Sequence, residues 1–283
     1  MKQTRTRGLS GTGLKWIALA LMVLDHIHYM FGYTGRVPVW FSMAGRLSAP
    51  LFLFCLAEGF AHTSNKRRYF IKVYIIHLLM SGLLFLMIAG VLPVRPDEFY
   101  PKNGMMTSFA ILMVVFQGMD WLGEKRWGPG LAAVALPLAW PVLASMLMGM
   151  VPALQMPLSV LGYTFLPMWN SNPDAGIGTI LTGILLYGFR KKRRVQAGVF
   201  AAFTVLYYFF YALLVFSRFP EFHWTMMFTT VYEWYGALAA IPMLCYNGER
   251  GRGPKRFFYV FYPAHVYILY ALSWAAYPLL AGG

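Results

Sequence analysis

The chain has 283 residues, of which 59% are hydrophobic and only 12% are charged. This composition excludes a soluble globular domain, because such a domain has fewer apolar residues and more charged ones. The net charge of +14 is shared among short loops between apolar runs, where Lys and Arg set membrane orientation. We therefore expect a multi-pass membrane protein that does not bind nucleic acid.

The apolar runs are long and continuous, unlike the short alternating segments of a membrane β-barrel. We predict an all-α fold, a polytopic helical membrane bundle that forms a single domain over 1–283. The expected full spans lie at about 14–33, 46–62, 69–92, 105–121, 128–150, 174–189, 197–217, 225–245 and 257–279.

The segment 151–173 is apolar, but it is short, and prolines interrupt it. We expect it to be re-entrant, which gives nine crossings, or ten if it crosses fully. With the N-terminus in the cytoplasm and nine crossings, most of the 24 Lys and Arg residues lie on the cytoplasmic side. The protein is thus expected in a bacterial inner membrane, with membrane lipids as neighbours.

The first span carries Asp25, His26 and His28 past its midpoint, with Lys15 at its start. Lys15 and His26 are separated by a rise of ~16 Å and project from nearly the same helix face. Ionisable groups at this depth are costly, so they usually face a bundle interior or an aqueous cavity and mark a functional site. This helix is therefore expected to line the site.

The polar residues of the apolar spans are concentrated in the first three, and they are Asp25, His26, His28, Arg46, Glu58, His62, Lys72 and His77. We predict His26 as a general base, because a carboxylate can fix the tautomer of an imidazole and raise its basicity. Either Asp25 or Glu58 could orient it, and the sequence leaves this choice open. In the structural alternative, Asp25 and Glu58 pair with His26 or Arg46 and hold helices together.

The histidines allow only a weak case for a metal site. Glu58 and His62 have the i, i+4 spacing of a ligand pair, but no third ligand is defined, so we expect no metal. Asn103 and His265 are further polar candidates, and His265 in its aromatic segment is better explained as a packing residue.

A basic run follows the second span, in the sequence NKRRYFIKVY at 65–74. Such a run can bind phosphate groups, or it can set topology and contact anionic lipids. The sequence does not decide between these interpretations.

Two stretches, LKWIALALMVLDHIH and GRLSAPLFLFCLAEGFAHTSNKRRYFIKVYIIHLL, resemble the TraX family, whose founding member acetylates the N-terminus of a conjugative pilin. The stretch EGFAHTSNKRRY is the most specific part. The same region is remotely similar to the acyltransferase-3 group of transmembrane acyltransferases, which carry a basic residue and a histidine in the first span. That pair corresponds to Lys15 and His26.

The resemblance implies an integral membrane acyltransferase that uses cytoplasmic acetyl-CoA as its donor. His26 would be the catalytic residue, and Lys15, Arg67, Arg68 and Lys72 would contact the CoA phosphates. The acceptor would be an amine or hydroxyl of a peptide, a glycan or a lipid-linked molecule. The alternative is a proton-coupled transporter or flippase in which Asp25, His26 and Glu58 relay protons.

Overall fold

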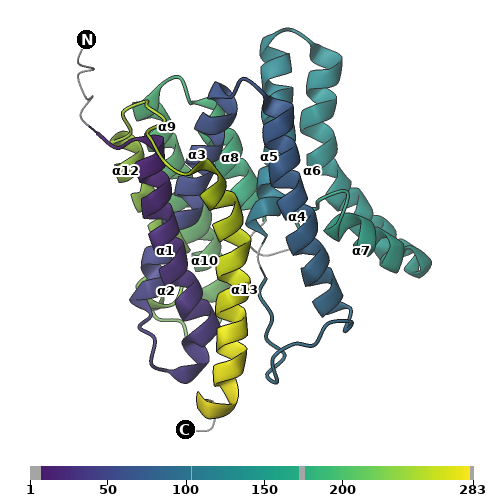
Figure 1. The fold of residues 1–283 in the computed structure, drawn as a ribbon, viewed down its shortest axis with the longest axis vertical. Coiled ribbons are helices and arrows are strands. Elements are labelled where there is room, and N and C mark those ends of the chain that lie inside the picture. The colour runs from purple at the N-terminus through teal and green to yellow at the C-terminus, as the bar shows by residue number, and fades with distance from the viewer. Residues whose placement is uncertain (1–7, 103, 172–175, 281–283) are drawn as a thin grey trace. The chain divides into compact units, whose positions relative to one another are not determined.

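The computed structural model describes residues 8–102, 104–171 and 176–280. These residues form helices joined by turns and loops, and no β-strand occurs among them. Figure 1 shows the chain as a set of helices. The all-α fold predicted from the sequence is confirmed.

The helices of the N-terminal half are α1 (Gly11–Phe31), α2 (Trp40–Gly45), α3 (Ser48–His62), α4 (Lys66–Ile88), α5 (Met105–Gly123), α6 (Trp127–Met150) and α7 (Gln155–Tyr163). Those of the C-terminal half are α8 (Ile177–Gly188), α9 (Arg193–Thr204), α10 (Phe210–Phe216), α11 (Met226–Thr229), α12 (Ala240–Leu244) and α13 (Lys255–Leu280). Shorter elements are the 3₁₀ helices η1 (Gly32–Thr34), η2 (Pro152–Leu154) and η5 (Glu233–Ala239), and the π-helical η4 (Val205–Phe209).

Within the described ranges, six helical stretches are long and apolar enough to cross a membrane. They are Gly11–Thr34, Trp40–His62, Lys66–Ile88, Met105–Gly123, Trp127–Met150 and Arg193–Phe216. A spanning helix needs about 20 residues because the hydrocarbon core is ~30 Å thick. The second stretch begins at Trp40, earlier than the sequence indicated, because α2 precedes α3.

The nine to ten spans expected from the sequence are not confirmed. The segment 151–173 contains a helix of 9 residues, and α8 has only 12, so each is shorter than the membrane core. The span expected at 225–245 is divided among α11, η5 and α12. The 26 residues of α13 are long enough, but their tyrosines and His265 lower the hydropathy, so α13 is not among the six.

The described chain divides into two compact units. Unit 1 consists of Met1–Leu56, Leu185–Arg256 and Leu279–Gly283, and unit 2 of Ala57–Ile184 and Phe257–Pro278. The chain passes from one unit to the other within α3, α8 and α13.

In unit 1, α1 packs against α2, and α9 packs against η5 and α12. The start of α1 is fixed in two ways. Ser10 caps the helix by accepting a hydrogen bond from the Gly13 amide at 3.2 Å. Leu9 pairs with the backbone after α12, donating to the Cys245 carbonyl at 2.8 Å and accepting from the Asn247 amide at 2.9 Å. The N-terminal end of α1 is therefore tied to residues more than 200 positions away.

In unit 2, α5 and α6 lie side by side and are joined by a short turn (Figure 1). Glycine permits their close approach, as it commonly does between membrane helices. A Cβ atom at Gly118 would lie 2.9 Å from the Gly130 carbonyl oxygen and 2.9 Å from Val134 Cγ2. A side chain larger than hydrogen at Gly118 would push the two helices apart.

The loop between α4 and α5 is fastened to α13 by Arg95, which is 2% exposed. Its guanidinium pairs with Asp97 at 2.7 Å and donates to Ser273 Oγ at 3.2 Å. The Tyr270 hydroxyl accepts from the Arg95 amide at 3.2 Å. The hydrogen bond from Arg95, together with its charge, lowers the pKa of the Asp97 carboxyl below its ordinary value of 3.8, although partial burial acts in the opposite direction.

Replacing Gly118 by leucine is expected to reduce the free energy of unfolding by about 1–3 kcal/mol, because the side chain overpacks the contact between α5 and α6. The matched control is Gly123→Leu in the same helix, where a Cβ would meet nothing within 4 Å. The check is thermal unfolding of the detergent-solubilised proteins. Equal midpoints for both variants would refute the close contact.

The Asp97→Asn variant is expected to be less stable than the parent at pH 7 by roughly 1–3 kcal/mol, because buried Arg95 loses its ionised partner. A carboxylate with a lowered folded-state pKa stabilises the fold above its unfolded pKa and loses that effect as the pH falls through the folded value. The difference between parent and variant should therefore begin to shrink as the pH falls below about 4, and it should continue to shrink toward the folded-state pKa. Unfolding curves between pH 7 and pH 3 test this, and a difference at pH 3 as large as that at pH 7 would contradict it.

Candidate functional site

The candidate residues fall into both units of the structure. Unit 1 holds Lys15, Asp25, His26, His28 and Arg46, while unit 2 holds Glu58, His62, Arg67, Arg68, Lys72, His77 and His265. Asn103 lies outside the described residues. The expectations that join residues of different units, such as Lys15 with Arg67 at the CoA phosphates or Glu58 with His26, stay predictions.

The clearest polar site of unit 1 is an ion pair between Asp25 on α1 and Arg46 at the end of α2. Arg46 Nη2 lies 2.5 Å from Asp25 Oδ1, and the same oxygen accepts a hydrogen bond from Ser42 Oγ at 2.9 Å. Arg46 also donates to the Ser42 carbonyl at 3.2 Å and to Ser42 Oγ at 3.0 Å. The structural alternative considered for Asp25, a pair with Arg46, is thus the one that the structure contains.

Gly45 makes this pairing possible. A Cβ atom at this position would overlap the Asp25 side chain, so only glycine lets α2 come this close to α1. Residues of both candidate spans therefore meet through a hydrogen-bonded charge pair, as charged groups in membrane spans do.

A second carboxylate, that of Glu233 in η5, faces the same guanidinium. Its Oε1 atom lies 4.0 Å from Arg46 Nη1, and the neighbouring Tyr232 ring lies 6.0 Å from the guanidinium carbon. The exposed side-chain fractions are 22% for Asp25, 29% for Arg46 and 45% for Glu233. One cation therefore lies between two carboxylates in a site that is partly open.

Glu233 and Ser42 were not among the residues singled out in the sequence. For Glu233 there was a signal, because it is the sole charged residue of the apolar stretch 225–245. For Ser42 there was none, since a serine one helical turn before Arg46 is unremarkable without the fold.

His26 makes its hydrogen bond within α1. Its Nδ1 atom donates to the Met22 carbonyl at 2.8 Å, and its ring meets Tyr29 edge to face at 6.4 Å. A carbonyl only accepts, so the proton of the neutral ring is assigned to Nδ1. The contact with the Met22 carbonyl therefore assigns the proton to this nitrogen, and the orientation of His26 by Asp25 or Glu58 stays a prediction.

In unit 2, the i, i+4 pair of Glu58 and His62 interacts through the backbone. His62 Nδ1 donates to the Glu58 carbonyl oxygen at 2.9 Å, while the Glu58 side chain is buried. Among the described residues, no three His, Cys, Asp or Glu side chains are grouped so that they could hold a metal ion.

The basic residues at the start of α4 differ in their contacts. Lys66 Nζ pairs with Asp120 Oδ2 at 2.6 Å and lies 4.9 Å from the Phe60 ring centroid. Lys72 Nζ lies 5.7 Å from the Tyr259 ring centroid. Arg67 and Arg68 are exposed on the first turn of α4. Lys66 thus holds helices together, and the phosphate-binding role of the other three stays a prediction.

Two further histidines are buried in unit 2. His77 Nε2 donates to the Thr164 carbonyl at 3.0 Å, and its Nδ1 lies 3.1 Å from the hydroxyl oxygens of Thr107 and Ser81 and accepts from one of them. This neutral ring joins α4, α5 and the segment after α7. His265 donates to the Phe261 carbonyl at 3.0 Å and stacks on the Phe261 ring at 5.2 Å, which is the packing arrangement of an aromatic helix.

Comparison with known proteins gives one relative of almost the same length. The chain is 26% identical over 275 residues to a protein of Dichelobacter nodosus named "Probable fimbrial assembly protein FimC, serogroup H1". The alignment covers 94% of this chain and 96% of that protein. No solved structure matches the chain.

The family described as "TraX protein" matches residues 10–273, from the cap of α1 to the last third of α13. This range includes both the charge pair of unit 1 and the histidine contacts of unit 2. The resemblance seen in the first spans therefore extends over nearly the whole chain, and the chain belongs to the TraX family.

Proposed function

We propose that this protein acts in fimbrial assembly, as a membrane component that receives the fimbrial subunit. The observation that carries the proposal is the relative named a probable fimbrial assembly protein, which aligns over 94% of this chain. Fimbriae are surface fibres of protein subunits made inside the cell, so their assembly includes steps at a membrane. The six apolar helical stretches suit such a location.

This proposal corrects the function expected from the sequence. We expected acetyl transfer from acetyl-CoA to an unspecified amine or hydroxyl with His26 as base, or else proton-coupled transport. The relative named a fimbrial assembly protein and the family match over residues 10–273 overturn that expectation. Neither comparison favours transport. The remote similarity to acyltransferase-3 proteins stays a prediction from the sequence.

The location is part of the proposal. We place the protein in the inner membrane of a bacterium with a cytoplasmic N-terminus, which the distribution of Lys and Arg between the apolar runs supports. The fimbrial subunit is then the polypeptide partner.

Deleting the gene in the bacterium that encodes this chain is expected to abolish surface fimbriae while the subunit accumulates in the cells. Electron microscopy and immunoblotting of the subunit check this, and a plasmid copy of the gene should restore the fimbriae. A deletion strain with the parental number of fimbriae would refute the proposal. The intact mass of the subunit from both strains tests separately whether enzymatic acetylation, with acetyl-CoA as donor, belongs to the role.

The charge pair of unit 1 can be tested by a double-mutant cycle with Asp25→Asn and Arg46→Gln. Each single change leaves a charge without its partner, so the two together should cost less than their sum, by about 1–3 kcal/mol. Thermal unfolding provides the free energies. In deletion strains complemented with these variants, the number of fimbriae should be lowest for the variant with the lowest free energy of unfolding.

The matched control for this cycle is Glu233→Gln. Its carboxylate is more exposed and lies 4.0 Å from the guanidinium, so the expected change is below about 1 kcal/mol. Additive effects of Asp25→Asn and Arg46→Gln, or a Glu233→Gln effect as large as theirs, would contradict the importance of this pair.

A further inference from the structure

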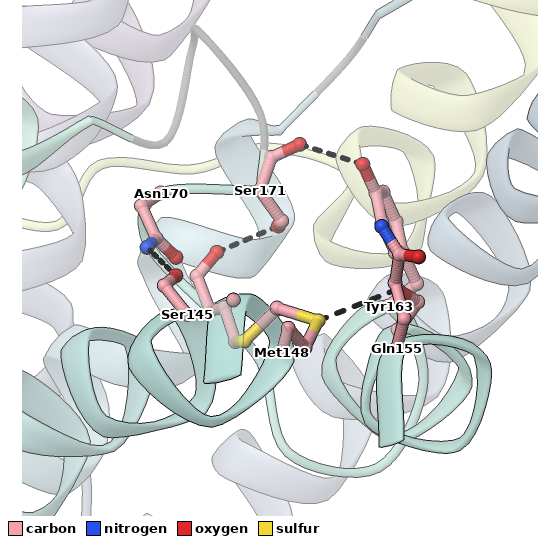
Figure 2. A pocket seen from close by; sticks show the side chains of 9 residues that line it. Ser145, Met148, Gln155, Tyr163, Asn170 and Ser171 are labelled. Atoms are coloured by element: carbon pink, nitrogen blue, oxygen red, sulfur yellow. Dashed lines mark hydrogen bonds between the residues drawn. The ribbon is translucent and has the colours of Figure 1, made fainter. Parts of the chain in front are cut away.

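Unit 2 contains a cavity of 420 Å³ beside the C-terminal end of α6. Its walls come from α6, from α7 and from the segment after α7 (Figure 2). The nine lining residues are Ser145, Met148, Gly149, Gln155, Ser159, Tyr163, Met168, Asn170 and Ser171. This volume is within the range of small-ligand pockets.

The lining is polar but uncharged. It offers hydroxyl groups, two carboxamides and two thioethers, and none of the nine side chains ionises near neutral pH. A buried phosphate, carboxylate or ammonium group would find no counter-charge here. The chemistry therefore selects a neutral ligand with hydrogen-bonding groups.

Several of these groups are already occupied within the protein. Asn170 Nδ2 donates to Ser145 Oγ at 2.8 Å and to the Pro141 carbonyl at 3.3 Å. The Tyr163 hydroxyl donates to the Ser171 carbonyl at 2.9 Å, as Figure 2 shows. Because a carbonyl only accepts, the contact with Pro141 assigns the amide nitrogen of Asn170 and leaves its Oδ1 as an acceptor.

Other groups remain available to a ligand. Within the described part of the chain, the Gln155 amide and Asn170 Oδ1 have no hydrogen-bond partner, and both side chains belong to exposed residues. The Ser145 hydroxyl accepts from Asn170, which leaves its own proton to donate. The groups available in the cavity thus include an acceptor, a donor and a carboxamide that is both.

We propose that this cavity binds the main chain of an extended peptide segment, which on the function proposed above belongs to the fimbrial subunit. A peptide group carries a donor that can pair with Asn170 Oδ1 and an acceptor that can pair with the Ser145 hydroxyl. The ester groups of a lipid provide only acceptors and cannot donate to Asn170 Oδ1. This difference favours a peptide over a lipid.

The two methionines suit the same ligand. Met148 and Met168 line the cavity beside the polar groups. Their flexible, polarisable side chains adapt to apolar surfaces of different shape, so they can accept varied side chains of a bound segment. Main-chain hydrogen bonds would then hold the segment, while the thioethers contact its side chains.

Gly149 provides the test. It lines the cavity, and a Cβ atom added there meets nothing within 4 Å, so Gly149→Phe fills the cavity without disturbing the backbone. Gly128→Phe is the matched control, because Gly128 lies at the other end of α6 and also has open space around its Cβ. Gln155→Leu removes the available amide at an exposed position.

Binding is measured with the full-length protein in lipid nanodiscs and the purified, fluorescently labelled fimbrial subunit of the same bacterium. Gly149→Phe is expected to raise Kd at least tenfold and Gln155→Leu about three- to tenfold, as expected for one lost hydrogen bond. Gly128→Phe should leave Kd unchanged. Parental Kd values for Gly149→Phe and Gln155→Leu would overturn the proposal, as would release of a co-purified neutral lipid by Gly149→Phe without any change in subunit binding.

Fimbriation of the same variants separates this proposal from the proposed function. If deletion of the gene abolishes fimbriae but Gly149→Phe cells keep them, the cavity assignment fails and the assembly role stands. If the deletion strain keeps its fimbriae, the assembly role itself fails. Thermal unfolding of each variant shows which proteins are folded, and Gln155→Leu decides the matter if Gly149→Phe is not.

Discussion

The pairing of Asp25 with Arg46 is the interaction on which the packing of the first two candidate spans in unit 1 depends. An unpaired charge in a membrane span costs several kcal/mol, so the two helices must meet where these side chains can reach each other. Gly45 supplies the necessary space, and Ser42 shares the Asp25 oxygen. The position of α2 against α1 therefore follows from one carboxylate and its partners.

A related constraint operates in unit 2, where several polar side chains have a partner from another element. His77 joins α4 to α5 and to the carbonyl of Thr164, and Lys66 at the start of α4 pairs with Asp120 near the end of α5. Arg95 fastens a loop to α13. These ionisable residues thus stabilise contacts between elements, and the presence of an ionisable residue in an apolar run does not by itself indicate catalysis.

The sequence predicted the long helices well, because an apolar run of membrane length has few alternatives to a helix. The helices α1, α4, α5 and α6 begin and end within a few residues of the expected limits. It could not predict that 225–245 breaks into three short helices. There Trp234 and Tyr235 donate to the carbonyls of Met227 and Phe228, and such side-chain bonds satisfy a broken backbone only once the fold brings them together.

In the candidate site, too, the sequence predicted individual residues but not their partners. Asp25 was identified from the sequence, but its partner was not, since Arg46 and His26 were both available and only the packing of α2 distinguishes them. Charged residues are easily singled out in a sequence because they are rare in apolar runs.

Gln155 and Asn170 are uncharged and were not singled out, yet they retain unused hydrogen-bonding groups beside a cavity. Asp25 Oδ1, in contrast, is already bonded twice. In a membrane protein, ligand binding needs polar groups that the fold leaves without a partner. Leaving a neutral amide without a partner costs far less free energy than leaving a charged group without one.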